Sequence, residues 1–247
     1  MEAADARRAL LARLFDHAPM FPPASLPVEE ALAEDARATG SASMFMLGRL
    51  VWPASAAEAI PRERDVSLVL DADPPPGIRV DAVEARARGE LASLSGLAHE
   101  VYVEVSIDEK LEERLDALAA AGLRAKVRCG GASIPSDAAL ARFVTGCRDR
   151  GLVFKATAGL HHAVRTNGEH GFLNLLAATV FEGHEERALA ERDVSAFGLT
   201  DRAFTWREHA APGAALERAR RERLHSIGSC SFFEPLDELA ALGMLPP

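Results

Sequence analysis

Cysteines, long apolar segments and excess positive charge are all scarce in this chain of 247 residues. The three cysteines, Cys129, Cys147 and Cys230, form no CxxC pair, so we expect reduced thiols rather than a disulfide framework. No apolar stretch approaches the roughly 18 residues that a membrane-spanning helix needs, and the first residues lack the apolar segment of a signal peptide. The formal net charge of -9 argues against nucleic acid or an anionic membrane as a partner. These absences predict a cytoplasmic protein.

Predicted strands alternate with predicted helices through the middle of the chain. Such an alternation is typical of parallel strands joined by right-handed helical crossovers, and the length is ordinary for one α/β barrel. We therefore predict a TIM-barrel-like α/β fold, modified or incomplete, with an open doubly wound sheet as the alternative. The strands that we expect are Met46–Val51, Val66–Asp71, Val101–Val105, Arg124–Cys129, Val153–Thr157 and Ile227–Phe232.

The two ends of the chain depart from this alternation. Residues 1–40 read as two helices joined by a proline-rich stretch, so we predict an N-terminal helical extension followed by a barrel domain over 41–247. Val80 to Leu94 reads as a helix, and Ser106 with Glu109 has the spacing of a capping box at the start of another. Residues 196–207 fit either a hairpin or two further barrel strands.

Charged residues occupy alternate positions of three consecutive predicted strands. Arg124, Lys126 and Arg128 alternate with apolar residues, as do Lys155 and Glu104 on the neighbouring strands. A parallel strand covered by helices is normally apolar throughout, and burying unpaired charges costs several kcal/mol. The pattern predicts a polar site inside the barrel. Its substrate-binding residues would be Arg49, Asp71, Arg128, Thr157, Ser229 and Ser231.

Lys155 is the first candidate for catalysis. Apolar neighbours and a nearby Lys126 disfavour its ammonium form, so we expect its pKa to fall and its neutral amine to attack carbonyl groups. Two alternatives remain open: Lys155 holds a substrate carboxylate or phosphate as a cation, or Glu104 forms a buried structural ion pair with Lys126 or Lys155.

The segment Lys155-Ala156-Thr157-Ala158-Gly159 resembles the K-x-[ST]-x-G strand of the deoxyribose-phosphate aldolase family. Lys126, followed closely by Gly130-Gly131, is similar to the second lysine strand of that family. The resemblance implies a TIM barrel in which Lys155 forms an imine with the substrate, Lys126 lowers the pKa of Lys155, and no cofactor takes part. The likeness is confined to these two strands. The strings KATAGLHH, HGFLN and GSCSF also resemble a family of proteins without an assigned activity.

The loop after Lys155 is rich in histidine. His161 or His162 could transfer the protons that imine chemistry requires, and Glu104 is the other candidate for this role. Adjacent side chains of an extended segment point in opposite directions, so at most one of the two histidines should face the site. His170 and Asn174 are further candidates for substrate binding.

Three functions are compatible with these residues. We expect an enzyme of lyase or aldolase type that acts on a small anionic carbonyl compound, an oxo acid or a sugar phosphate, without a cofactor. One alternative is a metal-dependent hydrolase or isomerase, although the histidine spacing matches no ligand motif such as HExxH and we assign no metal site. Its ligands would be His161 or His162, His170, Glu104 and Asp71. The other is a non-catalytic barrel that binds an anionic ligand. The oligomeric state, including a homo-oligomer, stays open.

Overall fold

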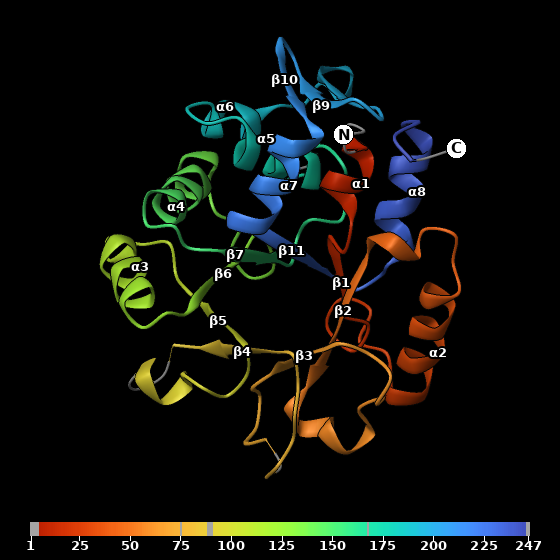
Figure 1. The fold of residues 1–247 in the computed structure, drawn as a ribbon, viewed down its shortest axis with the longest axis vertical. Coiled ribbons are helices and arrows are strands. Elements are labelled where there is room, and N and C mark those ends of the chain that lie inside the picture. Colours follow the sequence, from red (N-terminus) through yellow and green to blue (C-terminus); the bar gives the residue numbers. More distant parts are fainter. Residues whose placement is uncertain (1–4, 75, 88–90, 167, 246–247) are drawn as a thin grey trace.

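A computed structural model, which describes residues 5–74, 76–87, 91–166 and 168–245, contains a closed barrel of eight parallel strands. The strands follow one another around the barrel in chain order, and the last closes against the first (Figure 1). This arrangement confirms the TIM-barrel-like fold, and the open doubly wound sheet is wrong. The barrel strands are β1 (Phe15–His17), β2 (Leu47–Pro53), β3 (Val66–Val69), β4 (Ala82–Arg86), β5 (Glu100–Glu104), β6 (Arg124–Arg128), β7 (Phe154–Thr157) and β11 (Leu224–Ser229).

The helices cover the barrel unevenly. Full α-helices follow β1, β5, β6, β7 and β11, whereas the described residues that follow β2 and β4 form only short 3-10 helices, η2 (Ala54–Ala59) and η3 (Leu91–Leu94). Figure 1 shows loops rather than long helices beside β3 and β4. The α-helices are α1 (Ala6–Leu11), α2 (Val28–Thr39), α3 (Leu111–Ala120), α4 (Asp137–Asp149), α5 (Phe172–Val180), α6 (Glu185–Ala190), α7 (Gly213–Glu222) and α8 (Phe233–Ala241).

The first 40 residues are not a helical extension, because they contribute a barrel strand. Phe15 pairs with Ile227 of β11 and with Leu47 of β2, so β1, which lies between α1 and α2 in the chain, closes the barrel. A boundary at residue 40 therefore cuts through the barrel. A strand of three residues is too short to show a period of two, and the apolar residues before it read as part of a helical stripe.

The segment predicted as a helix over Val80 to Leu94 contains β4. Ala82 pairs with Ser67 of β3 and with Glu100 of β5, and η3 follows further along; residues 88–90 of this segment lie outside the described part of the chain. The sequence AVEAR favours a helix by intrinsic propensity. Hydrogen bonding to strands on both sides overrides this preference, as tertiary contacts often do.

Residues 197–212 form a separate antiparallel sheet rather than barrel strands. The strands β8 (Phe197–Leu199) and β9 (Ala203–Trp206) form the hairpin, and β10 (His209–Pro212) is a third strand.

The predicted capping box does not form. Helix α3 begins at Leu111, and the side chain of Asp108 accepts a hydrogen bond from the backbone N–H of Lys110 just before it.

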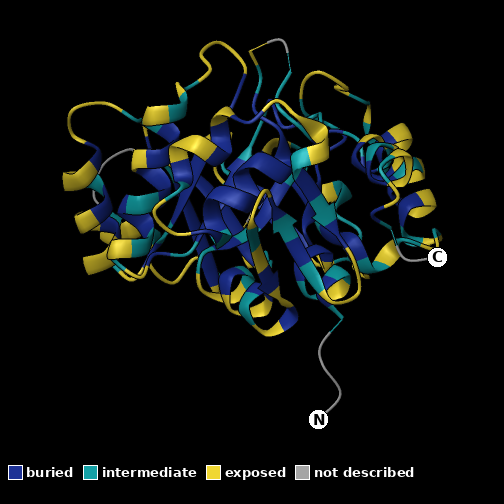
Figure 2. Cartoon of the chain, turned by 90° about the horizontal axis from the view of Figure 1, so that it is seen from above, coloured by how far each residue is buried: buried dark blue, intermediate teal, exposed yellow. Residues whose placement is uncertain are grey.

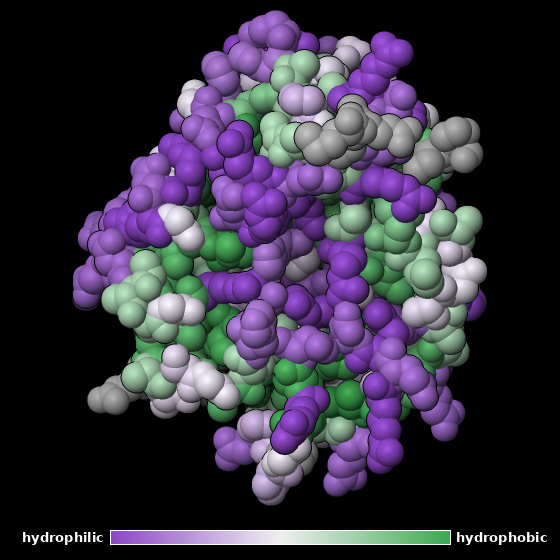
Figure 3. Space-filling model, viewed as in Figure 1, coloured by the Kyte–Doolittle hydropathy of each residue, from purple (hydrophilic) through white to green (hydrophobic). Residues whose placement is uncertain are grey.

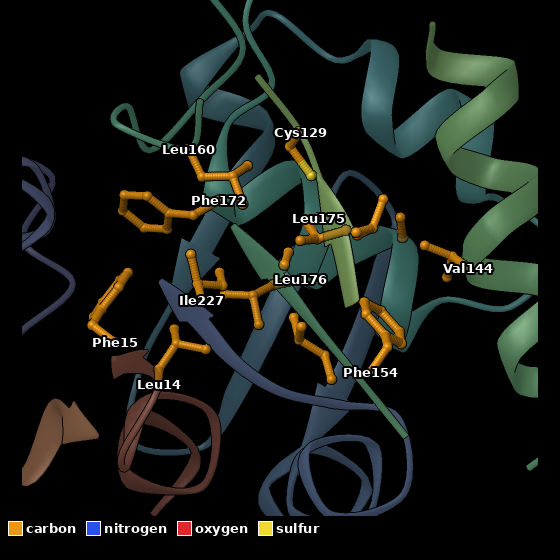
Figure 4. Close-up of a cluster of buried hydrophobic side chains, with 14 of the residues drawn as sticks. Leu14, Phe15, Cys129, Val144, Phe154, Leu160, Phe172, Leu175, Leu176 and Ile227 are labelled. Atoms are coloured by element: carbon orange, nitrogen blue, oxygen red, sulfur yellow. The ribbon is translucent and has the colours of Figure 1, made fainter. Parts of the chain in front are cut away.

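The apolar core fills the layer between the barrel and its helices (Figure 4). Phe15 of β1 meets Phe172 of α5 edge to face with ring centres 5.4 Å apart, and Phe143 of α4 meets Phe154 of β7 in the same way at 5.3 Å. Cys129 belongs to this core, as the strand alternation predicts. Figure 2 shows the buried residues in the middle of the molecule, with exposed residues on the outer helical faces and loop tips.

The outside of the molecule is largely hydrophilic on the face seen in Figure 1. Figure 3 shows hydrophilic side chains gathered over the centre and upper part of this face, with apolar ones visible between them. Within the described residues, no helix combines the length and the hydropathy required for a membrane span.

Candidate active site

A cavity of about 610 Å³ lies at the carboxyl ends of the barrel strands. This is the end at which barrel enzymes place their chemistry. Loops that follow β3 and β7 and the segment around Phe21 complete its wall. The strand residues that line it are Val51, Val69, Glu84, Ala85, Arg86, Glu104, Lys126, Arg128, Thr157, Gly228 and Ser229.

Lys126 lies at this cavity between two carboxylates. Its Nζ is 3.0 Å from Oε2 of Glu84 and 3.2 Å from Oε2 of Glu104. The side chain of Lys126 is 8% exposed and that of Glu84 only 2%, whereas that of Glu104 is 20% exposed. Glu84 is therefore a buried counterion, and Glu104 is the partner of Lys126 that solvent reaches.

Lys155 lies deeper in the barrel and does not line the cavity. Its Nζ donates to Oδ2 of Asp16 at 2.7 Å and to Oε1 of Glu84 at 2.5 Å, and its side chain is completely buried. Asp16 also accepts hydrogen bonds from Ser226 Oγ and from the backbone N–H of Arg49. The lysine is thus enclosed by carboxylates and has no exposed side.

The predicted fall in the pKa of Lys155 is wrong. Burial alone would lower the pKa of its ammonium group, but the charges and hydrogen bonds of Asp16 and Glu84 outweigh burial and raise it. Likewise, burial would raise the pKa of Glu84, but Lys155 and Lys126 hold it at about 2. Lys155 is therefore a charged cation enclosed by its carboxylate partners, and a ligand in the cavity does not reach its amino group.

Two arginines flank Glu104 at the mouth of the cavity. Arg86, Glu104 and Arg128 are the last residues of the adjacent strands β4, β5 and β6, and both arginines are exposed. Among the described residues, the side chain of neither arginine has a carboxylate or hydrogen-bond partner. Their positive charge is therefore directed at solvent and at whatever occupies the cavity.

The other predicted residues at the strand ends fall into two groups. Thr157 and Ser229 line the cavity, and so does Asp71, although its carboxylate accepts hydrogen bonds from the backbone N–H and the hydroxyl of Ser55. Ser231 does not line it. Its Oγ instead accepts from the backbone N–H groups at the start of α8, so its role is to cap that helix.

Only one of the two adjacent histidines lines the cavity, as the sequence predicts, although both contact carboxylates of α8. His161 lines the cavity, and its Nδ1 is 3.5 Å from Oε2 of Glu234. His162 lies away from it, with Nδ1 2.7 Å from Oε1 of Glu238 in α8. His161 is therefore the histidine available to a ligand.

His170, Asn174 and Arg49 do not line the cavity, so the structure does not bring them to the site at which the sequence predicts them. His170 is fully buried, with Nε2 2.8 Å from the carbonyl oxygen of Pro135, and burial lowers its pKa. Asn174 donates to two backbone carbonyls and accepts from the backbone N–H of Arg165, so it fastens the histidine loop to the helices behind it. Arg49 pairs with Glu100 at the opposite, amino-terminal end of the barrel.

Because the polar groups of His162 and His170 point elsewhere, the ligand set proposed for a metal-dependent hydrolase is not assembled. Three of its four proposed ligands, His161, Glu104 and Asp71, line the cavity, and the fourth, His170, does not. Asp71 is already bound to Ser55. The structure offers no support for that alternative with those ligands.

The loops after β6 and β7 touch through their backbones at the mouth of the cavity. A Cβ added to Gly130 would lie 2.6 Å from the Cα of Gly159, a distance at which one of the loops would have to move. Gly159 also has a φ of 69°, which glycine adopts without strain. These two glycines therefore fix the course of the segment that carries His161.

Lysine is rare in this chain, and its distribution is uneven. Only Lys110, Lys126 and Lys155 occur among the 28 basic residues, so the remaining cations are arginines. Two of the three lysines point into the barrel and touch the same carboxylate. A guanidinium forms ion pairs at least as well as an ammonium, but it does not deprotonate to a neutral amine. The interior lysines thus carry amino groups that can form a neutral amine, which the arginines of this chain do not provide.

Comparison with known protein families finds none whose model matches this chain. Comparison with curated proteins finds no match either. The residues of the cavity and their contacts therefore carry the functional argument by themselves.

Sequence reasoning missed the two carboxylates that organise the site, Asp16 and Glu84, and the cavity arginine Arg86. All three lie on β1 or β4, the strands whose segments read as helices. A signal did exist for Glu84 and Arg86: they stand two residues apart, which is the spacing that places side chains on one face of a strand.

Proposed function

We propose that this cavity is the active site of an aldolase-type lyase that forms an imine between Lys126 and a small anionic carbonyl compound. The observation that carries the proposal is the position of Lys126. Its amino group lines the cavity and contacts a solvent-accessible carboxylate, while the amino group of Lys155 is enclosed. The nucleophile would therefore be Lys126 and not Lys155, to which the sequence pattern assigns this role.

Arg86 and Arg128 support an anionic substrate. Each is free of a carboxylate partner within the described chain, and both reach the cavity from strands that flank β5. A guanidinium matches a carboxylate or a phosphate with two parallel hydrogen bonds. An oxo acid or a sugar phosphate held in this way would present its carbonyl group toward the floor of the cavity, where Lys126 lies.

Glu104 is the proposed acid and base. It would accept a proton from the ammonium group of Lys126. The neutral amine would then form a C–N bond with the carbonyl carbon, and one proton would pass from the nitrogen to the carbonyl oxygen to give the carbinolamine. Glu104 would return a proton to the resulting hydroxyl, which leaves as water and gives the iminium ion. When the bond between the α- and β-carbons breaks, Glu104 would accept the proton of the β-hydroxyl group, which becomes an aldehyde, and the bonding electrons would form an enamine with Lys126. Glu104 would then return the proton to the α-carbon, and water would hydrolyse the resulting iminium ion to the second carbonyl product and free Lys126.

Lys155 and Glu84 are positioning residues in this scheme. Glu84 binds both amino groups at once, one through each carboxylate oxygen, so the two lysines share one counterion. The side chain of Ser67 donates a further hydrogen bond to Glu84. The fixed carboxylate then sets where the Lys126 amino group lies.

Reduction with borohydride tests the proposal, because it converts an imine into a stable secondary amine. The protein would be incubated with pyruvate, glyoxylate and glyceraldehyde 3-phosphate in turn, reduced, and weighed intact by mass spectrometry. We expect one adduct per chain with at least one compound, retained in the surface variant Lys110→Met and lost in Lys126→Met. An adduct that survives Lys126→Met contradicts the proposal. So does binding of these compounds without any adduct, which would instead support the non-catalytic barrel.

A further inference from the structure

Three side chains with different donor atoms converge beside the cavity. His161, Cys230 and Glu234 each offer one ligand atom, and these three atoms lie within 4.8 Å of one another. His161 comes from the loop after β7, Cys230 follows the last residue of β11, and Glu234 lies in the first turn of α8. Within the part of the chain that the structure describes, no other set of three such groups comes as close.

The backbone around each member is held in place. The loop with His161 is fixed by the contact between Gly130 and Gly159. Cys230 is buried. The start of α8, and with it Glu234, is capped by the hydroxyl of Ser231. The approach of the three side chains is therefore built into the fold.

Cys230 distinguishes this group from an ordinary ion pair. An imidazole and a carboxylate pair on many protein surfaces. The side chain of His161 is partly buried, at 27% exposure, and that of Glu234 is exposed, at 56%. Such a pair requires no thiol. The two other cysteines, Cys129 and Cys147, are buried in the apolar core, so Cys230 is the one cysteine that reaches the cavity.

The donor set selects a class of metal ion. One nitrogen, one sulfur and one oxygen suit a borderline-soft transition metal ion such as Zn²⁺, whereas Mg²⁺ and Ca²⁺ are bound by oxygen ligands. Zinc sites with catalytic roles keep three protein ligands and leave a fourth position for water or substrate. His161 and Cys230 both line the cavity, so a fourth position would face its interior.

We propose that His161, Cys230 and Glu234 form a site for a Zn²⁺-class ion in the wall of the cavity. Its open position would bind an oxygen atom of the anionic ligand. This inference goes beyond the imine chemistry of Lys126 and does not depend on it, because neither lysine is a ligand. Substrate orientation at the cavity wall would then be shared between the ion and the arginines at the mouth.

Metal titration of the chelator-treated protein tests the site. We expect wild type to bind one Zn²⁺ per chain by calorimetry, and to show thiolate-to-metal absorption bands with Co²⁺. Cys230→Ala, His161→Ala and Glu234→Gln should each weaken binding by more than about tenfold, in line with the loss of a ligand. The absorption bands should vanish in Cys230→Ala and also in Cys230→Ser, which keeps the size of the side chain.

The neighbouring pair provides matched controls. His162→Ala and Glu238→Gln remove the other histidine and its own carboxylate, and Cys147→Ala removes a buried thiol elsewhere; all three should bind Zn²⁺ as wild type does. Circular dichroism checks that each variant is folded. Absence of stoichiometric binding by wild type, or equal weakening in His162→Ala, overturns the proposal. Borohydride trapping in metal-free protein tests Lys126 separately, so failure of either idea can be recognised.

Discussion

Lys126 and Lys155 are register partners on the adjacent strands β6 and β7, yet only Lys126 reaches the cavity. Both amino groups bind the carboxylate of Glu84, one at each oxygen. The pair is therefore asymmetric: Lys155 is a buried counterion, and Lys126 is the amine that a ligand can touch.

Replacing Glu84 with glutamine should destabilise the protein strongly. The change leaves two buried ammonium groups with only Asp16 and Glu104 as carboxylate partners, and breaking a buried ion pair typically costs about 3–5 kcal/mol. Urea denaturation would measure the loss in the free energy of unfolding. Glu112→Gln, which breaks an exposed pair with Arg142, serves as control and should leave the unfolding midpoint nearly unchanged. Equal effects of the two variants would contradict the buried network.

The stabilising effect of Glu84 should depend on pH in a defined direction. Its pKa is about 2 in the folded protein, against 4.5 for an unperturbed glutamate, so the unfolded chain takes up the proton first as pH falls. The contribution is complete above pH 4.5 and is lost as the pH drops toward 2. It corresponds to roughly 3 kcal/mol.

Urea denaturation of wild type and Glu84→Gln across this pH range isolates that contribution from those of other carboxylates. The difference in unfolding free energy between the two proteins should be constant near neutral pH and should shrink between pH 4.5 and 2. A difference that grows on acidification would mean that Glu84 is not held ionised by the lysines.

Arg128→Gln should weaken the binding of inorganic phosphate, used as the simplest anion that a guanidinium recognises. A hydrogen bond to a charged group contributes about 1.5–3 kcal/mol, so we expect the Kd to rise by about tenfold or more. Arg86→Gln should act in the same direction, and the two substitutions together should add. Calorimetry would measure the binding. Arg142→Gln is the matched surface control, and a similar loss there would exclude a specific site at the cavity mouth.

Asn174→Leu should lower stability without changing the chemistry of the cavity. The substitution removes the partners of three backbone groups, one N–H and two C=O, and each buried unsatisfied group costs about 1–3 kcal/mol. Thermal unfolding would report the loss. Borohydride adduct formation by the folded variant should match that of wild type. A selective loss of adduct in a stable Asn174→Leu protein would show that Asn174 contributes to substrate binding and would contradict this prediction.

The fold class and part of the cavity lining were predictable from the alternation of charged and apolar residues. Lys126, Glu104 and Arg128 stand on strands long enough to show a period of two, and these strands lie where the sequence predicts them. β1 and β4 were not predictable in this way. One has three residues, and the other consists of residues that prefer helices, so only pairing with distant strands defines them.

The role of Lys155 illustrates a second limit. Its burial was predicted, but the direction of its pKa shift depends on Asp16 and Glu84, which lie 139 and 71 residues away in the chain. The sequence around a lysine shows its apolar neighbours, but it does not show counterions that come from distant parts of the chain. The position of a charge could be predicted from the sequence, and its electrostatic environment could not.

Peptide mapping of the trapped adduct tests the central claim most directly. Wild-type protein would be reduced with borohydride in the presence of the compound that gives the adduct, then digested and sequenced by tandem mass spectrometry. The account predicts the modification on Lys126, in the peptide that contains the β6 strand. Modification of Lys155 instead would show that the buried lysine is the nucleophile and would contradict the account.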